Sequence, residues 1–142
     1  MTRQTWVEIL CGLLIVLFAY TGITKLFNRA NFELVLEAAP VIGPVSAKLL
    51  SWVIPVSELI ITVLLVLHKR KGLLLSSVLM SLFTLYIAYM LLTHSTLPCQ
   101  CGGVLKQMSW QQHLWFNVLF TLIAFTGLVL QSNYKLFAAR QS

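Results

Sequence analysis

Two cysteines separated by one residue, Cys99 and Cys101, are the side chains whose type and spacing most directly suggest chemistry. They occur in the sequence Leu-Pro-Cys-Gln-Cys-Gly-Gly at residues 97–103, between two long apolar segments. Pro98 disfavours helix at the residue before it, and the two glycines permit positive φ, so the pattern predicts a turn. Residues i and i+2 of an extended strand lie near the upper limit of about 6.8 Å for bridged Cα atoms, so a disulfide here requires a bent backbone. Such a bridge would be tight, and tight bridges are more easily reduced.

Three kinds of site are compatible with this turn. The first is thiol–disulfide exchange, in which a nearby cation lowers the pKa of one thiol and the other thiol resolves the mixed disulfide. The second is a zinc site, although one residue between two cysteine ligands is fewer than the usual two to four. The third is a structural clip, in which the disulfide only holds the turn. The candidate cations are His94, Lys106 and His113, which are otherwise interfacial polar residues. The candidate zinc ligands are His94, Cys99, Cys101 and His113.

A relay of electrons to a quinone through a second disulfide would need a further cysteine pair. The only other cysteine is Cys11, which falls in the first apolar segment, and we interpret it as a small buried apolar residue. A partner protein must therefore complete any electron relay. Tyr86 and Tyr89 fit either an interfacial aromatic belt or the lining of a quinone-like pocket.

The composition predicts an integral membrane protein. The chain is 58% hydrophobic and 10% charged, with a mean hydropathy of +0.86, whereas soluble domains carry about 25% charged residues. The first apolar segment lacks a small-residue cleavage site and contains Glu8, so we expect it to be retained. The prediction is a single all-α domain, a four-helix bundle over residues 1–142. Its spans are expected at about 5–27, 49–67, 73–93 and 110–131.

The lysines and arginines predict the orientation of this bundle. The side that carries six of them also carries a compact basic loop at residues 68–71, and the other side carries four. The positive-inside rule therefore predicts a protein of the bacterial inner membrane with both termini in the cytoplasm and the cysteine turn in the periplasm, where disulfides persist. The charges flank helix ends and form no basic face for nucleic acid. The first side has Arg3, Lys69, Arg70, Lys71, Lys135 and Arg140, and the second has Lys25, Arg29, Lys48 and Lys106.

The segment at residues 28–48 is too polar to span a membrane and too apolar for a free linker. We expect a short amphipathic helix on the outer surface, ended by Pro40 and Pro44. Before it, Gly22 allows close approach of a neighbouring helix.

Polar residues inside the spans mark a candidate interior site. Glu58 lies in an apolar run, where a carboxyl costs at least about 2.5 kcal/mol unless it is neutral or partnered. We expect it to face the bundle interior, either paired with Lys25 or protonated and hydrogen-bonded to backbone. Pro55, one turn earlier, frees a carbonyl and can kink the helix. Asn117 lies one turn after His113 on the same face, and we expect its amide to bond to a neighbouring helix.

At several of these positions the sequence resembles the DoxX-like membrane proteins. Within them it is most similar to the MauE group, which is named for methylamine utilisation. The resemblance rests on Gly-Ile-Thr-Lys-Leu at residues 22–26, Phe32, Pro55 with Glu58, and the Cys-x-Cys-Gly turn. It implies a four-helix membrane bundle associated with periplasmic redox maturation, with Cys99 and Cys101 as the redox pair and Lys25 and Glu58 as polar residues of the bundle. Gly103 departs from the aromatic that often follows Cys-Gly in that group.

Two function classes follow. One is a membrane protein that supports thiol–disulfide maturation of a periplasmic or membrane partner through the Cys99–Cys101 turn. The other is a non-enzymatic subunit or scaffold that stabilises a larger envelope complex, with the cysteines as a clip. The lipid bilayer is a partner in both, and neither requires a cofactor, although quinone and zinc stay open.

Overall fold

The computed structural model describes residues 2–93 and 109–140, and the side chains of these residues except at positions 110 and 134–140. This part of the chain contains no strand. Four of its helices are long and apolar enough to cross a membrane, which confirms the predicted all-α membrane architecture. The helices are α1 (Arg3–Phe27), α2 (Arg29–Glu37), α3 (Pro44–Leu67), α4 (Lys69–Leu92) and α5 (Trp110–Arg140).

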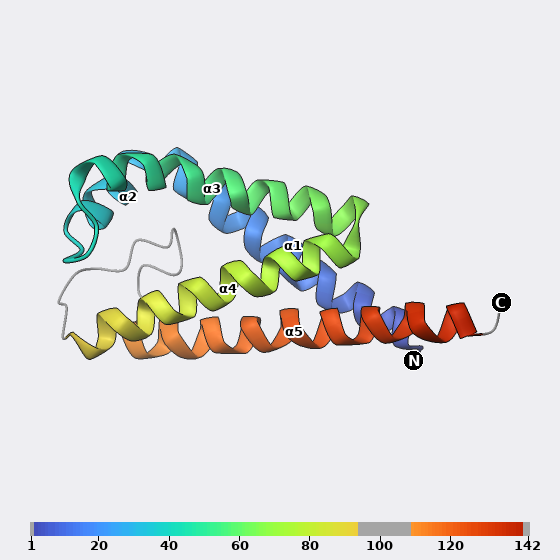
Figure 1. Ribbon diagram of the computed structural model, residues 1–142. Helices are drawn as coiled ribbons and strands as arrows, with labels where there is room; N and C mark the ends of the chain where they lie inside the picture. The colour runs from blue at the N-terminus through green and yellow to red at the C-terminus, as the bar shows by residue number, and fades with distance from the viewer. Residues whose placement is uncertain (1, 94–108, 141–142) are drawn as a thin grey trace.

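The four long helices form two antiparallel pairs. α1 packs mainly against α3, and α4 packs mainly against α5. Figure 1 shows the two chain termini and the α3–α4 junction at one end of the bundle, and α2 with the start of α5 at the other. The bundle therefore has two chemically distinct ends, because the residues around the α3–α4 junction are basic and those around α2 are mixed.

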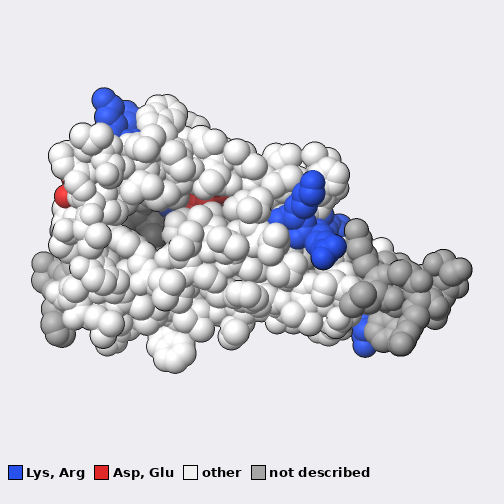
Figure 2. All heavy atoms as spheres, viewed as in Figure 1, with Lys and Arg blue, Asp and Glu red and all other residues white. Residues whose placement is uncertain are grey.

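The core begins with one face of α1, on which apolar residues recur every three or four positions. Cys11 is one of them and is a free, buried thiol, as its interpretation as a packing residue requires. The opposite helix faces expose large apolar side chains, which lipid would cover. Figure 2 shows almost no charge on the face between the two ends. The buried core residues are Val7, Cys11, Leu14 and Phe18 of α1, Ile61 and Leu65 of α3, Leu73 and Met80 of α4, and Ala124 of α5.

The short helix expected between the first two spans is present as α2. It is amphipathic, and it buries Phe32 and Leu36 against Ala47 of α3. On its polar side, the Arg29 guanidinium nitrogen lies 2.7 Å from the Glu33 Oε2 atom. The Arg29 Cζ atom lies 5.0 Å from the centre of the Trp52 ring of α3. α2 is therefore held on α3 by both apolar and cationic contacts.

Three helix ends differ from the predicted spans. α3 begins at Pro44 instead of residue 49, because the fixed φ of proline suits the first turn of a helix. The expected basic loop shrinks to His68, since Lys69 already begins α4. α5 continues to Arg140 instead of ending near residue 131. Hydropathy locates the apolar part of a helix, whereas backbone hydrogen bonding continues past it into water.

The one-residue junction between α3 and α4 depends on Gly72. A Cβ atom placed there would lie 2.6 Å from the backbone nitrogen of Leu65 and 2.7 Å from its Cα atom. These are backbone atoms and cannot rotate away, so the close approach of the two helices requires a residue without a side chain.

Replacing Gly72 with alanine should therefore destabilise the bundle by about 1–3 kcal/mol, the usual cost of overpacking. The midpoint of unfolding of the purified protein in detergent measures this loss. Gly12→Ala in α1 is the matched control, because a Cβ there meets nothing within 4 Å. Equal midpoints for the two variants would contradict the proposed role of Gly72.

Candidate functional site

An ion pair lies inside the bundle between α1 and α3. The Lys25 Nζ atom lies 2.5 Å from the Glu58 Oε1 atom, and the two residues are only 5% and 1% exposed. A charge buried among apolar helices is stable only when it is paired or neutralised. The structure thus confirms that Glu58 faces the interior. Of the two alternatives that the sequence left open, it shows the ion pair with Lys25.

Gly22 explains how two residues at different depths can meet. A Cβ atom at this position would lie 3.2 Å from the carbonyl oxygen of Pro55 and from the side chain of Leu59, so α1 and α3 are closest there. Lys25 lies about one turn beyond Gly22, and Glu58 lies about one turn in the other direction along antiparallel α3. The Cα atoms of the two residues therefore differ in depth by about 9 Å, from three residues on each helix at about 1.5 Å per residue. The long lysine side chain and the glutamate side chain extend toward each other across this interval.

Further polar side chains surround the ion pair. His113 and Asn117 of α5 are 3% and 5% exposed, and Thr21 of α1 is also buried. Together with the pair and five apolar side chains they line a cavity of about 40 Å³, which we call the polar cavity because the ion pair borders it. We call Thr21, Lys25, Glu58, His113 and Asn117 the polar cluster. It draws on three of the four spans.

The hydrogen bonds of the cluster are largely local. Asn117 Nδ2 donates to the carbonyl oxygen of His113, one turn earlier, at 3.0 Å. This bond stays within α5, because the i−4 carbonyl of its own helix is within reach of the amide nitrogen. The bond from Asn117 to a neighbouring helix stays a prediction. The Thr21 hydroxyl likewise donates to Leu17 of its own helix, at 3.0 Å.

One carboxylate oxygen of Glu58, the Oε2 atom, is buried without a hydrogen-bond donor among the described residues. The polar cavity beside it exceeds the 10–15 Å³ or so that one water molecule needs. The site can therefore hold a small polar molecule against a carboxylate oxygen whose negative charge is balanced by Lys25.

A second and larger space, the apolar cavity, adjoins the polar cluster. Its volume is about 290 Å³, near the lower end of the usual range for ligand sites. The Lys25 Nζ atom lies 5.3 Å from the ring centre of Phe83 and 5.8 Å from that of Phe32, within the range of cation–π attraction. Figure 2 shows a hollow on this otherwise uncharged face, with acidic and basic atoms visible at depth. The apolar cavity is lined by Lys25, Phe32, Val35, Leu36, Ile42, Leu50, Ile54, Leu79, Leu82, Phe83, Tyr86, Ile87, His113 and Asn117.

The tyrosines proposed for a belt or a quinone-like pocket separate in the structure. Tyr86 lines the apolar cavity, whereas Tyr89 is 42% exposed. Trp115 is also exposed, as an aromatic of an interfacial belt would be. Binding of a quinone stays a prediction.

The cysteine site lies outside the described residues. Cys99, Cys101, His94 and Lys106 all fall in residues 94–108, so exchange chemistry, the clip and the zinc set stay predictions. Within the described part of the chain, no three His, Cys, Asp or Glu side chains are grouped as a metal site would need.

Two contributions to the interior site were not predicted from the sequence. Thr21 lies one turn before Lys25 and so shares its face of α1, a helical spacing that could have identified it. Phe83, whose ring faces the ammonium group, carries no signal of this kind, because one phenylalanine in an apolar span looks like any other.

The fold and the buried polar cluster define an integral membrane protein, built as a four-helix bundle with an ion pair in its interior. Residues 3–130 match the family model described as methylamine utilisation protein MauE, so the chain belongs to the MauE family. No curated protein and no solved structure matches it.

The ion pair predicts strong coupling between its two partners. Lys25→Met or Glu58→Leu alone should lower the free energy of unfolding by about 3–5 kcal/mol, because each leaves a buried charge without its partner. The double variant should recover much of this loss, since neither charge remains. Unfolding of all four proteins in the same detergent gives the coupling energy. A double variant that loses the sum of the single losses would exclude a mutual interaction.

Proposed function

We propose that this MauE-family protein supports the maturation of a partner protein in the bacterial envelope by thiol–disulfide exchange at Cys99 and Cys101. The observation that carries the proposal is a Cys-x-Cys-Gly sequence in the connection between α4 and α5 of a MauE-family membrane bundle. Membership of a family named for methylamine utilisation supports a membrane accessory role, and the cysteine pair supports redox chemistry as the form of that role.

The exchange step conserves electrons within the two proteins. A thiolate of the reduced pair attacks a partner disulfide and forms a mixed disulfide, and the second cysteine then attacks it. The partner leaves with two thiols, and the pair becomes a disulfide. Run in reverse, the same step oxidises two partner thiols. A second envelope thiol protein resets the pair, because Cys11 is buried in α1 and has no cysteine beside it in the described structure.

The distribution of charge supports a periplasmic position for the pair. Arg3 and the first turn of α4 lie at the end of the bundle opposite to the start of α5, where the α4–α5 connection enters (Figure 1). With the basic end in the cytoplasm of the inner membrane, this connection belongs to the periplasmic side, where disulfides persist.

The polar cluster is the second support for activity at this end. His113 follows the first residue of α5 by only three positions, so the cluster lies close to where the connection joins the bundle. We propose that the Lys25–Glu58 pair holds α1 and α3 in register beneath this connection.

Cys99→Ser should abolish maturation of the partner, and Cys101→Ser should trap a mixed disulfide with it, if Cys99 is the attacking thiol. Affinity capture from membranes after acid quenching and thiol alkylation measures both effects. Cys11→Ala is the matched control and should leave capture and maturation unchanged. If the Cys99→Ser/Cys101→Ser variant supports full maturation while it still captures the partner, the protein acts as a scaffold and the exchange mechanism is wrong.

The orientation has its own test in intact cells. The Cys11→Ala variant is used so that Cys99 and Cys101 are the only native cysteines, and the pair is first reduced. A membrane-impermeant thiol reagent should then label Cys99 and Cys101. A cysteine placed at position 70 should stay unlabelled until the cells are opened. Labelling at position 70 alone would invert the topology and remove the pair from the oxidising compartment.

A further inference from the structure

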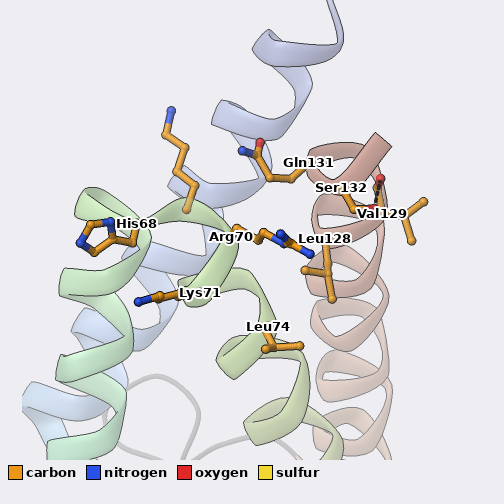
Figure 3. A pocket seen from close by; sticks show the side chains of 9 residues that line it. His68, Arg70, Lys71, Leu74, Leu128, Val129, Gln131 and Ser132 are labelled. Atoms are coloured by element: carbon orange, nitrogen blue, oxygen red, sulfur yellow. Dashed lines mark hydrogen bonds between the residues drawn. The ribbon is translucent and has the colours of Figure 1, made fainter. Parts of the chain in front are cut away.

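A basic cavity lies at the end of the bundle that holds the chain termini, between the first turns of α4 and the later part of α5. Its volume is about 710 Å³. Figure 3 shows Arg70 reaching from α4 toward α5, where Leu128 lies, and Gln131 projecting from α5 into the space between the helices. The residues that line it are His68, Lys69, Arg70, Lys71, Leu74, Leu128, Val129, Gln131 and Ser132.

The chain has no acidic side chain left to neutralise this cavity. It contains only four Asp and Glu residues in total. Glu58 pairs with Lys25 and Glu33 with Arg29, while Glu37 lies on α2 at the opposite end. Glu8 is not part of the cavity lining, and it pairs with Lys69 at 3.3 Å. The positive charges of Arg70 and Lys71 therefore have no side-chain carboxylate as a partner.

The backbone adds to this positive charge. Lys69, Arg70 and Lys71 occupy the first turn of α4, where unpaired N–H groups and the helix dipole already favour an anion. This turn contains no acidic residue, and His68 provides no side-chain cap. Cations at a helix start are unfavourable by themselves, so an external anion would relieve repulsion as well as form new contacts.

The lining also changes from charged to apolar along the helices. Leu74 lies one turn beyond Arg70, and Leu128 and Val129 precede Gln131 on α5. Leu74 and Val129 are 52% and 55% exposed, so this apolar part of the cavity is open to lipid chains. A ligand that fits both parts has an anionic head and an apolar body.

We propose that the basic cavity binds an anionic phospholipid, with the head-group phosphate at Arg70 and the acyl chains along Leu74 and Val129. Lys71, whose side chain points away from α5 in Figure 3, adds positive charge at the same helix start. The guanidinium group can form two parallel hydrogen bonds to phosphate oxygens, and the lysine supplies a second charge. A soluble phosphate offers the same head-group chemistry, but it would leave the apolar lining uncovered. The site is independent of the cysteines and of the proposed redox function.

Native mass spectrometry of the purified full-length protein in detergent tests this proposal. Phosphatidylglycerol should bind at least about tenfold more tightly than phosphatidylcholine with the same acyl chains, because each basic residue near an anionic lipid contributes about 1 kcal/mol. In the Arg70→Gln/Lys71→Gln variant the two lipids should bind equally. Lys48→Gln, which removes an exposed charge from α3 outside the cavity, should keep the wild-type preference.

Three results would overturn the proposal. One is equal binding of the two lipids by the wild-type protein. Another is an equal loss of preference in the Lys48→Gln variant, which would indicate nonspecific attraction by net charge. The third is displacement of bound phosphatidylglycerol by millimolar glycerol 3-phosphate, which would make the cavity a site for a soluble phosphate. Equal unfolding midpoints of the variants and the wild type confirm that lost binding does not reflect lost folding.

Discussion

The ion pair between Lys25 and Glu58 is the interaction on which the arrangement of this bundle depends. An apolar interior contains little that can solvate a charge, so each partner requires the other. The pair constrains α1 and α3 to one register, and Gly22 permits the approach that this register needs. The apolar contacts of the core would tolerate sliding of one helix past another far better than two charges 2.5 Å apart would.

The polar cluster also adjoins unfilled space in the interior of the bundle. Two cavities meet at Lys25, His113 and Asn117. The smaller one is bordered by both polar and apolar side chains, and the larger one is mainly apolar. Buried polar groups beside unfilled space lower the stability of the fold, because they lack both hydrogen bonds and packing contacts. These groups lie near the start of α5, which directly follows the segment that carries Cys99 and Cys101 in the sequence.

The two ends of the bundle divide its chemistry. The end with α2 contains two ion pairs, Arg29–Glu33 and, deeper in the bundle, Lys25–Glu58. The end with the α3–α4 junction has cations that exceed their carboxylate partners. This asymmetry supports both the orientation and the anionic lipid site that we propose.

The sequence by itself determined the number and type of the spans, the inward-facing Glu58 and the short helix after α1, because hydropathy and helical spacing are local properties. It identified Cys99 and Cys101 as candidates but left their chemistry open, since this depends on an environment that spacing does not define. Only the tertiary structure decided that Lys25 reaches Glu58, that Phe83 faces the ammonium group, and that α4 begins at Lys69 beside α5. Each of these depends on the depth and rotation of helices far apart in the chain, and packing between helices sets both.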